Sequence, residues 1–222
     1  MYIGSIMHTD LVTVPPEASL NDAQKLMDSK SIDHLLVINK NKKLVGILSG
    51  RDLKQYWASP ATSLSTHELS YLLDKVTAEM IMTKAVVTVN TTTTIERAAF
   101  IMQQHKISAL PVMENGDLAG LITSTDVMGL LFDAIGLSDA SVRLGVLVSD
   151  NIGELAKVTD VLKAVGVNIQ SLLCCQEKGY PEITHLVMRV AEQDKDSAIQ
   201  ALTKNNIKVM LQYEKDITPF LP

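Results

Sequence analysis

The sequence has few of the features that mark exported, membrane-spanning or disulfide-bonded proteins. Its two cysteines are neighbours, Cys174 and Cys175, and cannot form a disulfide framework or supply a full set of metal ligands. No apolar run approaches the roughly 18 to 20 residues that a membrane-spanning helix needs. The opening residues, MYIGSIMHTD, lack the cationic segment and apolar core of a signal peptide. We therefore expect a cytosolic, soluble protein in which both cysteines are buried core thiols.

Catalytic and metal-binding patterns are also missing. The five histidines are scattered, with no i, i+4 pair on a predicted helix, so we expect no metal site. Gly-rich phosphate loops and serine nucleophile elbows are absent. A catalytic thiol would need His185 on the neighbouring predicted strand as its base, and buried thiols are inert. A net charge of −5 does not favour a nucleic-acid surface. We therefore do not expect an enzyme.

The length and composition predict two globular domains. The chain has 222 residues, of which 46% are hydrophobic and 20% are charged, as in an ordinary globular protein. That length suits two cores of roughly 70 to 150 residues each.

An internal repeat occupies the first domain. Met7 aligns with Met82 and Met27 with Met102, each 75 positions later, and the intervening residues stay in register. The offset falls to 74 only after the turn NKNKK, whose counterpart ENGD is one residue shorter. A deletion that falls in a turn is what a structural duplication predicts, because turns tolerate changes in length.

Each repeat is predicted to contain a short extended start, a helix, two strands and a second helix. Ser19 and Thr94 occupy N-cap positions before LNDAQKLMDS and IERAAFIMQQ, whose apolar residues recur at helical spacing. HLLVIN with LVGILS, and ALPVME with LAGLIT, form hairpins around polar turns. Between the repeats, Ser65 and Glu68 form a capping-box pattern that predicts a linking helix over about residues 64–76.

These patterns resemble the CBS domain, a module found in tandem in energy-sensing and channel-regulating proteins. The resemblance rests on SALPV at Ser108–Val112, on hairpins that end in G-h-h-[ST]-x-x-D in both copies, and on the openings at Met7 and Met82. It covers about residues 1–135, with repeat one at about 1–58 and repeat two at about 77–135. The resemblance implies that the copies pack head to tail around a pseudo-two-fold axis and leave two clefts for adenosine-type ligands.

The aspartate after each hairpin has a chemical role in such a cleft. A carboxylate accepts strong hydrogen bonds from ribose hydroxyls, and the preceding hydroxyl residue and backbone N–H groups can meet phosphate. By resemblance, one cleft would combine Ser49, Arg51 and Asp52 with Val87, Ile107, Ser108 and Ala109, and the other would combine Thr123, Thr125 and Asp126 with Val12, Ile32, Asp33 and His34.

The two predicted clefts differ in charge. Arg51 has Thr125 as its counterpart, and guanidinium suits phosphate geometry, so we expect the Arg51 cleft to take the more highly phosphorylated ligand. The alternative reading is structural, since Ser/Thr-x-x-Asp after a strand is also an ordinary helix N-cap. Under that reading the repeats would form a scaffold without a ligand.

The last third of the chain, residues 141–222, has a different pattern. Its strands and helices follow the order βαββαβ, which predicts a ferredoxin-like α+β sandwich. The segment DNIGELAKVTDVLKAVGVNIQSL resembles the ACT domain, a regulatory module that commonly senses amino acids. This resemblance implies an amino-acid-binding corner formed by Asp150, Asn151, Gly153, Asn168 and Ile169.

In that corner the N–H groups of Gly153 and Glu154 would hold a carboxylate, and the Asn168 amide would accept from an α-ammonium. The alternative is that Gly166 ends a helix and Asn168 lies in a turn. ACT domains normally pair side by side, so the resemblance also implies a homodimer.

The whole arrangement, CBS–CBS–ACT, resembles the AcuB-type regulatory proteins associated with acetoin utilisation. It predicts a cytosolic sensor that binds an adenine nucleotide of the AMP, ADP or ATP type, takes an amino acid as a second ligand, and transmits occupancy to a partner protein. The alternatives left open are a ligand-free interaction scaffold or regulatory subunit, and an enzyme with an unrecognised site. No nucleic acid, membrane or metal is expected as a partner.

Overall fold

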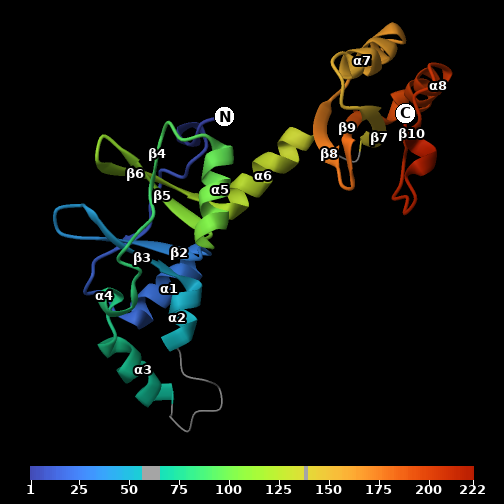
Figure 1. Cartoon of the computed structure of the whole chain (residues 1–222). Helices are drawn as coiled ribbons and strands as arrows, with labels where there is room; N and C mark the ends of the chain where they lie inside the picture. The colour runs from blue at the N-terminus through green and yellow to red at the C-terminus, as the bar shows by residue number, and fades with distance from the viewer. Residues whose placement is uncertain (57–65, 138–139) are drawn as a thin grey trace. The chain divides into compact units, whose positions relative to one another are not determined.

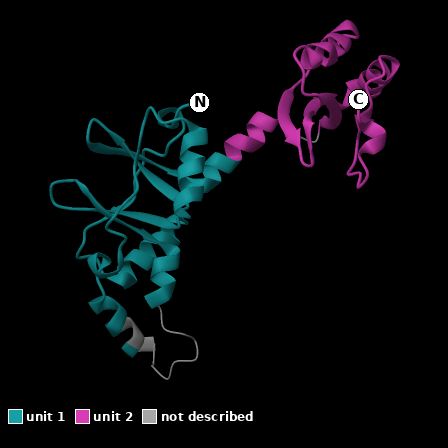
Figure 2. Cartoon of the chain, in the orientation of Figure 1, with its two compact units in different colours: residues 1–128 teal, residues 129–222 magenta. Residues whose placement is uncertain are grey.

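The computed structural model describes residues 1–56, 66–137 and 140–222. Contacts between Cα atoms divide the chain into two compact units, residues 1–128 and residues 129–222 (Figure 2). Along these described stretches, no helix is both long and apolar enough to cross a membrane.

Two three-stranded sheets form the first unit (Figure 1). Their strands are β1 (Thr13–Val14), β2 (His34–Ile38) and β3 (Leu44–Ser49) in one sheet, and β4 (Val89–Asn90), β5 (Ala109–Glu114) and β6 (Asp117–Thr123) in the other. In each sheet the first strand runs parallel to the second, and the second and third form an antiparallel hairpin. The register shifts immediately after Val37 in one hairpin and after Val112 in the other, so the predicted repeat is present in the backbone.

The helices of this unit are α1 (Leu20–Lys30), α2 (Gly50–Tyr56), α3 (Thr66–Lys75), α4 (Ala78–Ile81) and α5 (Ile95–His105), and α6 (Ser124–Ile135) follows the second hairpin; a 3-10 turn, η1, covers Ile3–Ser5. Helices α1 and α5 begin where the sequence predicts, whereas α4 and η1 were not predicted, because the opening of each repeat was expected to be extended. Ser19 Oγ accepts from the Asp22 N–H at 3.1 Å, and Thr94 Oγ1 accepts from the Arg97 N–H at 3.3 Å, which confirms both N-caps. Ser65, the first residue of the predicted capping box, lies outside the described residues.

The opening of each repeat packs on the other repeat. Ile3 is fully buried among residues of α5, β5 and β6, whereas Ala78 and Ile81 are buried with α1, β2 and β3. A Cβ on Gly46 would overlap the side chain of Met82, and a Cβ on Gly120 would overlap that of Met7. Each opening belongs in sequence to the repeat that follows it, but its apolar side chains fill the core of the other repeat. The exchange ties the two repeats into one unit.

The second unit is a four-stranded antiparallel sheet with two helices. Its elements are β7 (Ser141–Ser149), α7 (Glu154–Ala164), β8 (Ser171–Glu177), β9 (Tyr180–Ala191), α8 (Lys195–Lys204) and β10 (Val209–Met210), with 3-10 turns η2 (Glu192–Asp194) and η3 (Thr218–Phe220). The strand order is β10-β7-β9-β8, so the predicted ferredoxin-like βαββαβ arrangement is confirmed. Leu162 of α7 and Leu202 of α8 are both buried in one core with Leu144, Leu186 and Met188, which places both helices on one face of the sheet.

The two cysteines are exposed, so the prediction of buried core thiols is wrong. They do lie in a predicted strand, β8, but β8 is the edge strand of its sheet and has a neighbour on one side only. Cys175 faces His185 across the β8–β9 ladder, yet His185 Nδ1 lies 3.1 Å from Glu177 Oε2 and its Nε2 is buried over Gly145. This geometry gives the thiol no base of the kind that a cysteine nucleophile requires.

Candidate functional site

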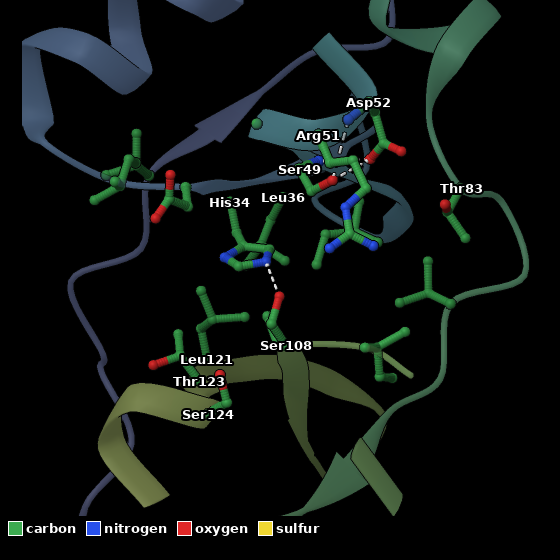
Figure 3. Close-up of a pocket in the computed structure, with 18 of the residues that line it drawn as sticks. His34, Leu36, Ser49, Arg51, Asp52, Thr83, Ser108, Leu121, Thr123 and Ser124 are labelled. Carbon is green, nitrogen blue, oxygen red and sulfur yellow. Dashed lines mark hydrogen bonds between the residues drawn. The ribbon is translucent and has the colours of Figure 1, made fainter. Parts of the chain in front are cut away.

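A cavity of about 930 Å³ lies in the first unit and takes its walls from both repeats (Figure 3). The predicted site residues that line it are Val12, Ile32, Asp33, His34, Ser49, Arg51, Asp52, Val87, Ile107, Ser108, Ala109, Thr123 and Thr125. Asp126 does not itself line the cavity, although Thr123, its hydrogen-bond partner, does. Apart from Asp126, the residues of the two predicted clefts thus line one cavity in the structure.

A capping box lies at each end of this cavity, where a hairpin runs into a helix. Between β3 and α2, Asp52 Oδ2 accepts from the N–H and the hydroxyl of Ser49, both at 2.7 Å, and the Asp52 N–H donates to Ser49 Oγ at 3.3 Å. Between β6 and α6, Thr123 and Asp126 repeat these three bonds at the same lengths. The capping role is therefore real in both repeats, but it engages only one oxygen of each carboxylate.

The second carboxylate oxygen distinguishes the two aspartates. Asp126 Oδ1 lies 2.9 Å from His8 Nε2, whereas Asp52 Oδ1 has no hydrogen-bond or ion-pair partner among the described residues. Partial burial acts to raise the pKa of Asp126, but the hydrogen bonds from Thr123 and His8 outweigh it and hold that pKa below its usual value. Asp52 thus presents an unused anionic acceptor to the cavity.

An imidazole–hydroxyl contact crosses the middle of the cavity. His34 Nε2, at the start of β2, lies 2.9 Å from Ser108 Oγ, which comes from the other repeat (Figure 3). Burial lowers the pKa of His34, and the nearby carboxylates of Asp33 and Asp52 only partly oppose this effect. The imidazole is therefore neutral at pH 7 and can donate or accept one hydrogen bond through Nε2.

Three cationic side chains line the cavity that Asp52 also lines. Arg51 is exposed to the cavity and forms no ion pair within the described ranges, and Lys54 and Lys106 line the same space. Figure 3 shows Arg51, Asp52 and Thr83 on the same side of the cavity. In the described part of the chain, no group of three or more His, Cys, Asp or Glu side chains is placed to hold a metal ion.

Sequence reasoning missed several residues of this cavity. His8 and Thr83 occupy equivalent positions of the two openings, 75 residues apart, and both line the cavity. Each forms a two-bond backbone bridge to the hairpin of the other repeat, His8 with Leu121 and Thr83 with Ile47. The alignment of the repeats pairs His8 with Thr83, so this difference is visible in the sequence. The contact of His8 with Asp126, however, arises only because the opening of repeat one packs on repeat two.

The predicted amino-acid corner of the second unit comes from two segments, the loop between β7 and α7 and the residues between α7 and β8. Asp150 Oδ1 accepts from the Thr184 hydroxyl at 3.0 Å. Gly153 has φ +94°, a conformation that favours glycine, but the Glu154 N–H already donates to the Asn151 carbonyl at 3.3 Å. One of the two N–H groups assigned to a ligand carboxylate is therefore engaged within the loop.

The residues after α7 serve the helix end. Gly166 has φ +74° and its N–H donates to the Lys163 carbonyl at 3.0 Å, as expected of a glycine that ends a helix. Asn168 is exposed, while Ile169 is partly buried against the core of this unit. Gly166 therefore ends helix α7, as the alternative to a ligand corner predicts.

The first unit is a tandem CBS module. The CBS domain family matches residues 3–59 and 78–133, just over half of the chain, and the chain belongs to this family. The two matched segments contain both hairpins and both capping boxes that border the cavity.

Curated relatives contain the same kind of segment within longer proteins. An inosine-5'-monophosphate dehydrogenase of Korarchaeum cryptofilum is 34% identical over 165 residues, which cover 71% of this chain and 31% of the relative. A homoserine O-acetyltransferase of Methanohalobium evestigatum is 33% identical over 131 residues, which cover 59% of this chain and 24% of the relative. The chain thus spans about a third or less of the length of these two relatives.

Solved structures resemble the first unit along most of their own length. A protein of Vibrio cholerae named for acetoin utilization (AcuB) is 30% identical with a TM-score of 0.50, and the match covers 62% of this chain and 94% of that one. The CBS domain pair of protein MJ0100 is 25% identical with a TM-score of 0.50, covering 60% and 97%. The latter was solved in complex with 5'-methylthioadenosine and S-adenosyl-L-methionine.

Proposed function

We propose that this chain is a regulatory sensor whose CBS module binds an adenine nucleotide in the cavity between the repeats. The observation that carries the proposal is the free Oδ1 of Asp52, held at the cavity wall by its capping box and flanked by Arg51. The adenosine-type ligands of the MJ0100 domain pair support the same ligand class for this chain.

The side chains suggest a binding arrangement. The two ribose hydroxyls would donate to Asp52 Oδ1, since ionised acceptors make the stronger hydrogen bonds. The guanidinium of Arg51 would meet phosphate, for which its planar donors are suited. The adenine ring would contact the apolar wall formed by Val87, Ile107 and Ala109.

Such a ligand would touch both repeats, which gives it a way to act as a signal. Because Ser108 contacts His34 across the cavity, a ligand at this wall competes with that contact and changes how the repeats are joined. We infer that a partner protein reads this change in the cytosol, in a role such as the control of acetoin utilisation. An enzymatic role is not proposed, since the two enzymes named above share only 24–31% of their length with this chain.

The ferredoxin-like unit supports a second ligand and self-association. Its topology is the one expected of an ACT domain, so we infer an amino acid as an additional ligand near Asp150 and Asn168. Strand β8 is an exposed edge whose backbone can pair with a second copy, which favours a homodimer. If both ligands bind, any coupling between them must be reciprocal.

The test is calorimetric titration of the purified full chain with AMP, ADP, ATP and S-adenosylmethionine, repeated on Asp52→Asn and Asp126→Asn. Asparagine keeps an oxygen for the capping box but removes the charge that binds the ribose. Loss of a charged hydrogen bond typically costs about 1.5 to 3 kcal/mol, so Asp52→Asn should weaken binding by roughly tenfold or more. Asp126→Asn makes the same change in the other half and should leave the stronger site, at Asp52, unchanged. Flat titrations with all four compounds would contradict the proposal and favour the ligand-free scaffold.

A further inference from the structure

The two halves of the cavity are built on the same frame. Each has a capping box with one carboxylate oxygen engaged at 2.7 Å, and each has an opening residue bridged by two backbone hydrogen bonds to the hairpin. These bridges measure 2.9 and 2.9 Å for His8 with Leu121, and 3.0 and 3.1 Å for Thr83 with Ile47. The opening residue therefore stands in the same relation to its aspartate in both halves.

The side chain at that position differs. His8 extends its Nε2 to 2.9 Å from Asp126 Oδ1, the oxygen that corresponds to the free Oδ1 of Asp52. Thr83 forms no hydrogen bond to Asp52 among the described residues. A chemically equivalent acceptor is thus occupied in one half of the cavity and open in the other.

We propose that His8 acts as an internal competitor for the Asp126 half of the cavity, so that one chain binds a first nucleotide at Asp52 and a second only weakly at Asp126. This inference rests on the proposed function, because it takes the ribose hydroxyls as the groups that compete with the imidazole. Both need the same carboxylate oxygen, and both donate to it.

The exposure of the contact determines how strong the competition is. The His8 side chain is 61% exposed and that of Asp126 is 22% exposed. An exposed side-chain contact of this kind shifts an equilibrium by about fivefold at most, and the imidazole can swing into solvent when it is displaced. His8 therefore weakens the second site and does not abolish it.

A second difference acts in the same direction. Arg51, beside Asp52, corresponds to Thr125 beside Asp126, so the second half also lacks the guanidinium that would meet phosphate. The two halves therefore differ through side chains, Arg51 against Thr125 and Thr83 against His8, while the backbone bridges and the capping boxes are alike.

The experiment compares the number and strength of ATP sites by calorimetry in the full chain and in exchange variants. In the unchanged protein we expect one stronger and one weaker site. His8→Thr gives the second half the residue that Thr83 provides in the first, and it should tighten binding at the weaker site about fivefold. His8→Thr combined with Thr125→Arg should tighten it by roughly tenfold more, and bring the two sites close together.

The reciprocal variant, Thr83→His, tests the same idea in the other half. It should place an imidazole against Asp52 Oδ1 and weaken the stronger site by about fivefold, with no change at the weaker one. Circular dichroism and the melting temperature establish that each variant folds. A His8→Gln variant, which can also donate to Asp126, should behave like the unchanged protein at the second site.

The outcomes separate this inference from the proposed function. Two equal sites in the unchanged chain, or an unchanged weak site in His8→Thr, would overturn the role of His8 and leave nucleotide binding intact. An absence of binding in every variant would overturn both proposals. Binding by His8→Thr alone would support competition by His8 and refute the assignment of the first site to Asp52.

Discussion

Repeat one and repeat two place equivalent capping boxes where β3 meets α2 and where β6 meets α6, with hydrogen bonds of equal length. They differ at positions that face the cavity: Arg51 against Thr125, and Thr83 against His8. The capping hydrogen bonds are alike in the two repeats, whereas these two pairs of cavity residues differ in charge and in hydrogen-bonding groups. The two halves therefore share a backbone frame but offer a ligand different side chains.

The largest expected effect tests the structural equality. Leu35 and Leu110 occupy equivalent places in β2 and β5, and both are fully buried. Leu35→Ala and Leu110→Ala should each lower the free energy of unfolding by about 2 to 5 kcal/mol, because each leaves a cavity in a packed core. Urea denaturation followed by circular dichroism measures the loss, with exposed Lys25→Ala as the control. Costs that differ by several kcal/mol would show that the repeats are not equivalent structurally.

The next effect tests the exchanged openings. Gly46→Ala forces a methyl group into the side chain of Met82 and should destabilise the protein by about 1 to 3 kcal/mol. Thermal melts should show partial recovery in Gly46→Ala combined with Met82→Ala, since the shorter side chain frees the space. Gly129 has no neighbouring atom within 4 Å of an added Cβ and lies in α6, so Gly129→Ala should be neutral or stabilising. A Gly46→Ala protein as stable as the unchanged chain would contradict this packing.

A somewhat smaller effect tests the chemical difference between the halves. Arg51→Gln should weaken ATP binding by about tenfold and leave adenosine binding unchanged, because only the phosphates meet the guanidinium. Calorimetry on both ligands measures the contrast, and Lys40→Gln, in the exposed hairpin turn, controls for the lost charge. Equal weakening of ATP and adenosine would mean that Arg51 supports the fold of the site and does not contact phosphate.

Local patterns predicted most of the first unit because its elements are specified locally. The N-caps at Ser19 and Thr94 and the strand LVGILS at 44–49 are found where the sequence places them, since capping and period-two alternation depend on near neighbours. Strand β8 was also predicted, but its position at the sheet edge depends on strand order, so the exposure of Cys174 was not.

Long-range pairing explains the rest of what sequence reasoning missed. His8 and Asp126 are 118 positions apart, and no local pattern links them. Their contact follows from the exchange of the openings, which depends on how Met7 fits Gly120 and Met82 fits Gly46. The cavity residues were predicted from the resemblance to the CBS domain, whereas the contact of His8 with Asp126 depends on how the opening of repeat one packs on repeat two.

The smallest expected effect is a pH dependence of stability that only repeat one should show. It comes from the imidazole of His34, which lies at the start of the hairpin of that repeat. His34 corresponds to Ala109, and burial lowers the pKa of His34 below its usual value near 6.5. The unfolded chain therefore takes up this proton at a higher pH than the folded chain does. The stability that depends on neutral His34 is fully present above about pH 6.5 and is lost as the pH falls through the lowered folded pKa. His34→Gln can keep a hydrogen bond to Ser108 without titrating. Between about pH 7 and about pH 5.5, a range that spans the ordinary histidine pKa, its melting temperature should therefore fall less than that of the unchanged protein. Parallel melting curves for the two proteins would show that His34 is not protonated differently in the folded and unfolded states.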